Sequence, residues 1–502
     1  MKWRWRQTPL FLVLLPVFFV LHGFVENFNA IGLSDCLLLI ALYTGAALVI
    51  YGIFFQFYRS PAKAALLSAF CMAFFLFFGA LHDLFRQHSI FLHKYSILLP
   101  LFLVALVALI VYLRKHGPFP RLIFFLNMLL LLYTLIDSGL LVKKALATSA
   151  GPQAAYSATA HHYQPCDGCP RPDIYFLLFD EYSGNKALRE LYQYDNSALD
   201  SFFLGEQFRV QHNSRSNYYF TPFSMASILN FSYLQAIPDG GRISADDQIN
   251  ILDSIRKCEV VNFLRARGYR ILNYSFFDLP GHPASFDQGF IPVKTRLITN
   301  RTLLHYLERD LQNSIWAGLW GKADFRKKRI TEAFEGNIGA LARTMEESRK
   351  SAADPRFVYL HVFLPHFPYL FDSLQRKKDP EVVARQMNEG EIEPYLAYLP
   401  YTNARIRELI TTIKKNTDGK AVIVFMSDHG FRDSRRPGYR PYFFQNQNAV
   451  YFPDKDYHLL YDSISAVNEF RVVFNKLFRQ DLPLLKDSVI YLTEQPQNPM
   501  PR

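Results

Sequence analysis

Cysteine is scarce in this sequence, and this scarcity narrows the class of protein. Five cysteines in 502 residues are too few for a disulfide-rich scaffold, and only Cys166 and Cys169 have the Cys-x-x-Cys spacing. A zinc ribbon would need a second such pair, which the sequence lacks. Two interpretations remain for the pair: a small disulfide loop in an oxidising compartment, or two free thiols.

Charged residues are also few. They make up 20% of the chain, whereas hydrophobic residues make up 50% and aromatic residues 16%. The net charge is +11, but the sequence contains no nucleic-acid-binding motif, internal repeat or low-complexity tract. Basic loops beside a membrane explain this excess of positive charge. We therefore expect no nucleic acid partner.

Long apolar runs are concentrated in the first third of the chain, and the composition after about residue 170 is that of an ordinary globular protein. Five runs are long enough to cross a hydrocarbon layer of about 30 Å. They cover residues 9–25, 33–57, 62–81, 96–113 and 122–142.

Basic residues flank these runs unevenly. Lys2, Arg4 and Arg6 precede the first run, and further lysines and arginines separate the second from the third and the fourth from the fifth. The positive-inside rule assigns these loops to the cytoplasm. Five spans then leave the rest of the chain on the periplasmic or extracellular side of the cell membrane. The first run resembles a signal peptide, but no small-x-small site follows it, so we expect a retained, multi-pass anchor.

Two features near the membrane have alternative interpretations. Asp137 falls inside the fifth run, where a carboxylate is costly and suggests function. Its nearness to the outer interface also fits a solvated or hydrogen-bonded structural role. An apolar helical stripe that ends at Trp316, with Trp320 after it, either packs in a core or contacts lipid headgroups.

Beyond the membrane region, apolar strand-like runs alternate with helical patterns, as in α/β folds. We predict a transmembrane helical domain over residues 1–145 and a polar linker over 146–171. Residues 172–502 are predicted to form a catalytic α/β sandwich with a mostly parallel central sheet.

Polar side chains follow three of the strand-like runs. Because parallel strands deliver their carboxyl ends to one edge of a sheet, such side chains converge there. An acid and an imidazole side by side suit a divalent cation, although Asp-His-Gly also fits a simple turn. The run AVIVFM is followed by Asp428, His429 and Gly430, DIYFLLF by Asp180 and Glu181, and FVYLHVF by a Pro-His-Phe-Pro segment with His366.

Thr221 lies beside Pro222 at the predicted start of a helix. Threonine in such a place is most often an N-cap. The functional interpretation uses the same geometry, because a helix amino terminus presents N–H groups and a positive dipole to an anion beside the hydroxyl.

In their order along the chain, these pieces resemble the alkaline phosphatase and sulfatase superfamily. The corresponding segments are DIYFLLFDE, TPFSMASILN, FLPHFPY and FMSDHG. With five preceding spans, the chain is similar to lipoteichoic acid synthases and lipid A phosphoethanolamine transferases. The resemblance implies an alkaline phosphatase-like catalytic domain.

The resemblance also implies roles for individual residues. Asp180, Thr221, Asp428 and His429 would hold one divalent metal ion, which is Zn²⁺, Mn²⁺ or Mg²⁺. Thr221 would be the nucleophile, and His366 would bind the phosphoryl oxygens or protonate the leaving group.

Two departures from the pattern bear on the reaction. Sulfatases oxidise a Cys or Ser within Cys/Ser-x-Pro-x-Arg to formylglycine, whereas this chain has Thr221 and no arginine four residues later. Oxidising a threonine would give a ketone, so sulfate-ester hydrolysis by that route is disfavoured. Asn403 stands where many relatives have an Asp.

We therefore expect a membrane-bound, metal-dependent phosphotransferase that moves a phosphoryl-linked headgroup through a phosphothreonine. Its partners would be a membrane lipid and a phospholipid or glycan substrate. Two alternatives are a sulfatase-like hydrolase of sulfate or phosphate esters and an inactive membrane-anchored structural partner.

Several side chains near the predicted site have a structural interpretation beside the functional one. Glu181 is expected to lie behind the metal ligands or at the surface, Ser224 to hydrogen-bond structurally, and His361 to be a buried core histidine. Arg432, Arg435 and Arg436 either grip a phosphate or belong to a solvated loop.

Overall fold

The computed structural model divides the chain into two compact units. It describes residues 8–28, 31–88, 94–148, 163–286, 295–307, 322–385, 391–432 and 437–494. Unit 1 comprises Met1–Ala150 and Phe290–Lys322, and unit 2 comprises Gly151–Gly289 and Ala323–Arg502. The chain therefore passes between the units three times, because residues 290–322 leave unit 2 and then return to it.

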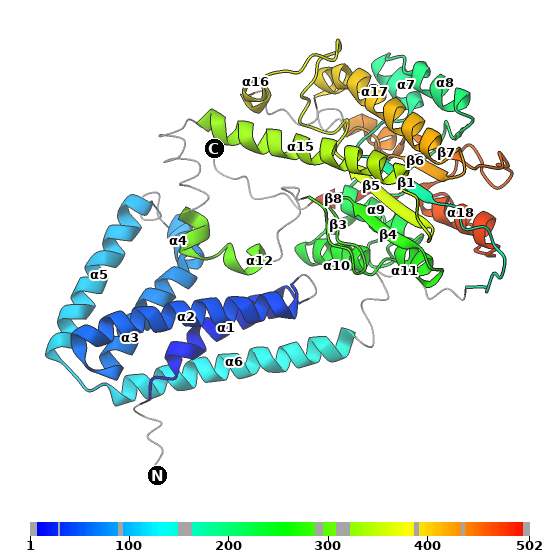
Figure 1. Ribbon diagram of the computed structural model, residues 1–502. Coiled ribbons are helices and arrows are strands. Elements are labelled where there is room, and N and C mark those ends of the chain that lie inside the picture. Colours follow the sequence, from blue (N-terminus) through cyan, green and yellow to red (C-terminus); the bar gives the residue numbers. More distant parts are fainter. Residues whose placement is uncertain are drawn as a thin grey trace. The chain divides into compact units, whose positions relative to one another are not determined.

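Unit 1 is helical (Figure 1). Three of its helices, α2, α5 and α6, are long and apolar enough to cross a membrane, and the bent pair α3–α4 makes a fourth if it is one span. The first predicted span is a shorter apolar helix of 16 residues, α1. The helices are α1 (Phe11–Glu26), α2 (Leu33–Tyr58), α3 (Pro61–Leu76), α4 (Phe78–His88), α5 (Tyr95–Lys115), α6 (Pro120–Thr148) and α12 (Arg296–Thr299).

The segment around α12 belongs to unit 1 because its apolar side chains pack on the amino-terminal helices. Ile298 lies so close to Gly23 of α1 that a Cβ there would meet it at 3.0 Å. The Gly79 N–H donates to the carbonyl of Arg301 at 2.8 Å, and Tyr306 packs edge-on against Phe78. The domain boundaries expected from the sequence did not include this return, since they treat residues 172–502 as one piece. Trp316 and Trp320 lie outside the described residues.

Unit 2 is built on a six-stranded sheet in the order β2-β7-β6-β1-β5-β4. The four adjacent strands β6, β1, β5 and β4 run parallel, with β4 at the edge of the sheet, and β7 pairs antiparallel with β6. This confirms the prediction of a mostly parallel sheet. The strands are β1 (Ile174–Phe179), β2 (Arg209–Val210), β4 (Arg270–Tyr274), β5 (Arg356–Val362), β6 (Val422–Met426) and β7 (Asn448–Tyr451), with β3 (Gly241–Ile243) and β8 (Leu492–Glu494) in a separate two-stranded sheet.

Helices cover both faces of this sheet. The contacting side chains assign α7, α8, α15 and α17 to one face and α18, with α9 packed beside it, to the other. The helices are α7 (Asn185–Tyr192), α8 (Ser197–Gly205), α9 (Thr221–Leu229), α10 (Ala245–Arg256), α11 (Glu259–Ala266), α15 (Lys322–Arg349), α16 (Pro380–Arg385), α17 (Ile392–Asn416) and α18 (Glu469–Phe478), with the 3₁₀ segments η2 (Pro437–Phe444) and η3 (Ala466–Asn468).

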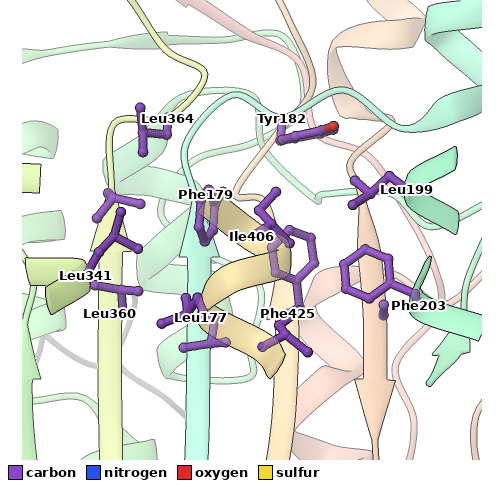
Figure 2. Close-up of a cluster of buried hydrophobic side chains, with 14 of the residues drawn as sticks. Leu177, Phe179, Tyr182, Leu199, Phe203, Leu341, Leu360, Leu364, Ile406 and Phe425 are labelled. Carbon is purple, nitrogen blue, oxygen red and sulfur yellow. The ribbon is translucent and has the colours of Figure 1, made fainter. Parts of the chain in front are cut away.

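The alternation of side chains along each strand produces two apolar layers. Leu177 and Phe179 of β1 meet Phe425 of β6 and Ile406 of α17 on one face (Figure 2). On the other face, Phe176 of β1 packs edge-on against Phe470 of α18, with ring centroids 5.0 Å apart. Both faces of the central strands are therefore dry, as their continuous apolar sequence requires. Elsewhere in unit 2, Cys166 and Cys169 form a disulfide.

Candidate active site

The carboxyl ends of β1 and β6 bring two acids together. The two strands are neighbours in the sheet, and each is followed by an aspartate, Asp180 after β1 and Asp428 after β6. Both side chains are fully buried. The backbone N–H of Glu181 donates to Asp428 Oδ1 at 3.0 Å, which ties the two strand ends. Asp180, Asp428 and His429 offer ligand atoms that all lie within 4.8 Å of one another.

His429 presents an unprotonated nitrogen to this space. Its Nδ1 lies 2.8 Å from the carbonyl oxygen of Gly430, an acceptor, so Nδ1 carries the proton and donates it there. Nε2 is then a lone-pair acceptor, and it faces Asp428 Oδ2 at 3.3 Å. Burial, followed by the nearby charge of Arg432, lowers the pKa of His429 to about 3, so the ring stays neutral. A neutral imidazole oriented by a backbone carbonyl is the usual arrangement of a metal-binding histidine.

Gly430 allows the close packing behind this pair. A Cβ at this position would lie 2.5 Å from the carbonyl oxygen of Gln445 and 2.8 Å from that of Tyr442. Any side chain would push η2 and the following backbone away from the end of β6. The glycine is needed for this close approach of two backbone segments.

Thr221 reaches the same space from α9. It is the first residue of the helix, Pro222 follows it, and no side chain caps the helix at Phe220. Its hydroxyl lies 3.2 Å from His429 Nε2 and 3.5 Å from Asp180 Oδ2. Thr221 is therefore placed with the acids and the imidazole instead of capping its own helix. Ser224, one turn later, donates to the backbone carbonyl of Asp428 at 2.6 Å and anchors α9 to β6.

The donor set fits a divalent cation. Asp180 Oδ1 and Asp428 Oδ2 are buried and have no hydrogen-bond partner within the described part of the chain. The atoms that face one another are carboxylate oxygens, an imidazole lone pair and a hydroxyl oxygen, all of which are electron donors. Burial and the neighbouring Asp428 raise the pKa of Asp180 well above its ordinary value. Such a set is stable when ionised only around a positive charge, and its mixed oxygen and nitrogen ligands suit Zn²⁺, Mn²⁺ or Mg²⁺.

His366 and Glu181 lie beside this donor set. His366 Nε2 lies 3.7 Å from Glu181 Oε2, and its Nδ1 lies 2.9 Å from the carbonyl oxygen of Phe367. Burial lowers the pKa of His366, but the carboxylates of Glu181 and Asp180 outweigh it, so the net shift is upward. Glu181 is buried, not at the surface, and its backbone has a left-handed φ of 60°. The Tyr395 hydroxyl donates to its carbonyl and holds this strained conformation.

Arg432 contacts Glu181 as well. Its backbone N–H donates to Glu181 Oε1 at 3.1 Å, and its guanidinium Nε lies 3.5 Å from the same oxygen. The guanidinium also stacks over the ring of Phe220, 5.4 Å from its centroid. A cation and a protonatable imidazole thus flank Glu181 next to Thr221. Arg435 and Arg436 lie outside the described residues.

His361 lies beside the donor set, although the sequence predicted only a core histidine. It is the penultimate residue of β5 and is fully buried, with Nε2 3.4 Å from Asp180 Oδ2. The Tyr359 hydroxyl lies 2.8 Å from its Nδ1. Burial lowers the pKa of His361 to about 3, so the ring is neutral. The available signal was its position one residue before the carboxyl end of a strand, directly opposite Leu178 of β1.

Asn403 does not lie with the metal-ligand candidates. Its side chain accepts a hydrogen bond from the Tyr182 hydroxyl and donates to Asn196 Oδ1 at 2.8 Å. Tyr182 is fully buried among the residues of the core cluster (Figure 2). Asn403 therefore belongs to a hydrogen-bond network between α17, α7 and α8.

Comparison with known proteins identifies one family. Residues 293–468 match the sulfatase family model, a range that includes His366, Asp428 and His429 and excludes Asp180 and Thr221. No curated protein matches the chain. Among solved structures, the chain is similar to the C-terminal periplasmic domain of EcEptC from Escherichia coli, with 10% identity, 67% of this chain and 93% of that chain covered, and a TM-score of 0.40.

Two further solved structures have the same level of similarity. The phosphonate monoester hydrolase SpPMH from Silicibacter pomeroyi is 12% identical over 64% of this chain and 75% of that chain, with a TM-score of 0.37. The Bacteroides thetaiotaomicron protein BT33494S-sulf is 14% identical over 61% of this chain and 72% of that chain, also with a TM-score of 0.37. Because these scores lie below 0.5, the assignment depends on the family match. The sulfatase match over residues 293–468 agrees with the resemblance to the alkaline phosphatase and sulfatase superfamily that the sequence motifs indicate.

Proposed function

We propose that this protein is a membrane-anchored phosphotransferase that moves a phosphoryl-linked headgroup from a phospholipid to a hydroxyl acceptor on the outer face of the cell membrane. The observation that carries the proposal is the position of the Thr221 hydroxyl, 3.2 Å from His429 Nε2 and 3.5 Å from Asp180 Oδ2. A threonine is a competent nucleophile only when something lowers the cost of losing its proton. The buried donor set around it provides such a setting.

Asp180, Asp428, His429 and Thr221 would hold the metal ion. When bound, the ion would supply positive charge that favours ionisation of the hydroxyl and neutralises phosphoryl oxygens.

The first half-reaction uses Thr221 and His366. The Thr221 proton passes to solvent, the Oγ1–P bond forms in line, and the P–O bond to the lipid breaks. The departing lipid alkoxide takes a proton from His366 Nε2, whose pKa the carboxylates of Glu181 and Asp180 raise against the effect of burial. The products of this half-reaction are a diacylglycerol and a phosphothreonine that carries the headgroup.

The second half-reaction reverses these roles. The acceptor hydroxyl attacks phosphorus and gives its proton to His366, while the P–Oγ1 bond breaks and Thr221 regains a proton from solvent. Arg432 would contact the phosphoryl oxygens, since a guanidinium matches the geometry of a phosphate. Its stacking on Phe220 orients it beside Thr221.

Trapping the covalent intermediate tests this proposal. The full-length protein, purified in detergent with its metal, is incubated with phospholipid labelled in the headgroup phosphate, quenched in acid, and digested for mass spectrometry. We expect label on Thr221 and none in Thr221→Ala, whose turnover falls by at least about 10³-fold. Thr402→Ala is the matched control, because the buried Thr402 hydroxyl donates to the backbone carbonyl of Tyr398 in its own helix. Full turnover in Thr221→Ala, or label on Ser224, would refute the assignment.

A hydrolase of phosphate or sulfate esters on the same site is the second candidate. The sulfatase family match favours this second function, because sulfatases are hydrolases of sulfate esters. The two functions differ in the species that accepts the group from Thr221. Product analysis with and without an added hydroxyl acceptor separates them, since release of the free headgroup phosphate at an unchanged rate in both conditions identifies a hydrolase.

A further inference from the structure

A chain of ionisable side chains crosses one end of unit 1, which is otherwise apolar. Asp137 of α6 lies 3.2 Å from His22 Nδ1 of α1, and His22 Nε2 lies 3.4 Å from Glu26. Glu26 in turn lies 3.5 Å from the guanidinium of Arg301, which follows α12. The four residues come from three separate parts of the sequence, and the chain alternates anionic and cationic or protonatable groups.

The exposure of the side chains in this cluster increases from the buried Asp137 to Arg301 at the surface. The exposed fraction of the side chain is 7% for Asp137, 45% for His22, 44% for Glu26 and 59% for Arg301. A cluster that only clamped helices together would be sealed, because exposed ion pairs stabilise a protein little. The distance between the Arg301 guanidinium and the Glu26 carboxylate is 3.5 Å, which is longer than a strong charge-assisted hydrogen bond. The guanidinium is thus oriented by Glu26 and remains accessible.

The depth of the cluster matches that of a lipid headgroup. Asp137 lies 17 residues after the start of α6, or about 26 Å along the helix axis. This distance is close to the thickness of the hydrocarbon layer, so the cluster lies near the interface opposite the start of α6. Around Asp137, α6 presents the exposed side chains of Leu135, Ile136 and Leu140, along which acyl chains would lie. The topology proposed above makes this the outer interface.

A second cation lies at the same end of the unit. The Lys144 ammonium donates to the backbone carbonyl of Val25 at 2.6 Å, next to Glu26 in the sequence. The carboxyl end of α1 therefore has a lysine, an arginine and a glutamate around it. A phospholipid headgroup carries a phosphate, which arginine recognises well, on a polar stem that glutamate and histidine can hydrogen-bond.

We propose that His22, Glu26, Asp137 and Arg301 form a phospholipid-binding site, with the headgroup phosphate on Arg301. The site holds a lipid at the outer interface, and Asp137 and His22 orient Glu26 and Arg301. It deepens the proposed function by giving the enzyme a lipid-holding site separate from Thr221. Lipid binding accounts for the presence of Asp137 in the apolar helix α6, where a carboxylate is energetically costly.

Native mass spectrometry of the full-length protein released from lipid nanodiscs tests the site. Phosphatidylglycerol is the probe, and diacylglycerol with the same acyl chains is the comparison that lacks the phosphate. We expect the wild type to retain the phospholipid at least about tenfold more than diacylglycerol, and Arg301→Ala to reduce this retention about tenfold. Arg114→Ala is the matched control, since Arg114 lies in the last turn of α5 and outside the cluster.

Further arms separate folding, soluble anions and catalysis. Arg301→Lys keeps the charge and is expected to retain at least half of the binding, which distinguishes lost phosphate recognition from lost folding. Millimolar glycerol phosphate should displace little lipid, and full displacement would identify a site for soluble anions instead. Thr221→Ala should bind lipid as the wild type does, so failure of the proposed function leaves this result unchanged. Wild-type retention in folded Arg301→Ala, or loss of retention in Thr221→Ala, would overturn the proposal.

Discussion

An aspartate flanks each end of strand β1, and the two aspartates differ in the charges that surround them. Asp173 precedes the strand and Asp180 follows it. At the first end, Asp173 accepts hydrogen bonds from Arg356, at 2.7 Å from its backbone N–H and at 3.1 and 2.5 Å from its guanidinium. The other side of that guanidinium faces Glu347 at 3.7 Å. Lys350 lies 2.8 Å from Glu347, so two acids and two cations compensate one another.

At the other end, Asp180 meets a second acid instead of a base. Asp428 is its neighbour, His429 and His361 are neutral, and one oxygen of Asp180 has no hydrogen-bond partner among the described residues. The comparison separates two uses of buried charge. A compensated cluster such as that at Asp173 stabilises the fold, whereas an uncompensated one is costly unless a ligand supplies the missing charge.

The largest effect is expected from removing one of the uncompensated acids. Asp428→Asn should lower turnover by at least about 10³-fold, because the donor set loses a charged ligand. Metal bound per protein, measured by elemental mass spectrometry, should fall from stoichiometric to near zero. The metal-free variant should melt at a higher temperature than metal-free wild type, since the repulsion between the two acids is gone.

The matched variant at the other end of the strand is Asp173→Asn. It should leave the metal content unchanged and lower only the stability. Chelation of the wild type should abolish turnover, and adding back the divalent ion should restore it. Stoichiometric metal in Asp428→Asn, or a stable active protein after complete chelation, would contradict the contrast between the two ends.

Breaking the compensated cluster should cost stability and not chemistry. The Arg356 side chain is 5% exposed, and Arg356→Met leaves the half-buried Asp173 without its cation and the buried Glu347 with only the exposed Lys350 and Arg270. Loss of one partner of a buried pair destabilises by about 3–5 kcal/mol, which urea unfolding of the variant should measure. Arg349→Met, which removes a pair with Glu346 at the surface, is the control and should change stability by less than about 1 kcal/mol. Loss of metal from folded Arg356→Met would contradict the separation between a stabilising cluster at Asp173 and a metal-binding one at Asp180.

A third buried carboxyl isolates the effect of burial from that of a neighbouring acid. Glu469, at the start of α18, is fully buried, accepts one hydrogen bond from Asn448, and has its other oxygen without a partner in the described chain. Burial raises the pKa of Glu469 to about 7 from 4.5. Because this folded-state pKa is raised, the unfolded state ionises first, and stability falls as the pH rises from 4.5 to 7 and stays low above that range.

Glu469→Gln should therefore stabilise the protein most at high pH. The gain in free energy of unfolding should reach up to about 3 kcal/mol at pH 8 and fall below about 1 kcal/mol at pH 5. Denaturant titration at both pH values measures it, with exposed Glu346→Gln as the control. An equal gain at both pH values would attribute the effect to packing, not ionisation.

The smallest expected effect is at His361, which contacts the uncompensated end without being one of the predicted ligands. His361→Gln should weaken metal binding about tenfold, as changes to groups that orient metal ligands do. Competition with a coloured chelator measures this affinity, and exposed His458→Gln is the control. An affinity below the limit of detection would show that His361 is itself a ligand.

The sequence was informative for the candidate site residues that directly follow a strand. Asp180 and Asp428 could be found because a buried parallel strand needs a continuous apolar run, and its first polar residue marks the edge of the sheet. Their meeting then followed from the parallel order of the strands. Thr221 could be placed only by resemblance, because its approach depends on how α9 packs, through Ser224, on the end of β6.

Other features had weak local signals. His361 is surrounded in sequence by core residues, and only the register of β5 against β1 reveals that it lies beside Asp180. The return of residues 290–322 to unit 1 could not be predicted, because Ile298 and Tyr306 are unremarkable apolar residues whose partners are more than 200 positions away. Long-range packing of this kind leaves no periodic pattern in the chain.

This return has a practical consequence for anyone who wishes to study the catalytic unit alone. Cutting the chain anywhere between residues 150 and 163 would leave the two halves joined through residues 290–322, so limited proteolysis at that point cannot separate them. A soluble fragment that starts after residue 150 would still carry Ile298 and Tyr306, now without the helices that bury them. A well-behaved fragment therefore requires two changes to the gene: removal of the first 150 codons and replacement of codons 290–322 by a short polar bridge.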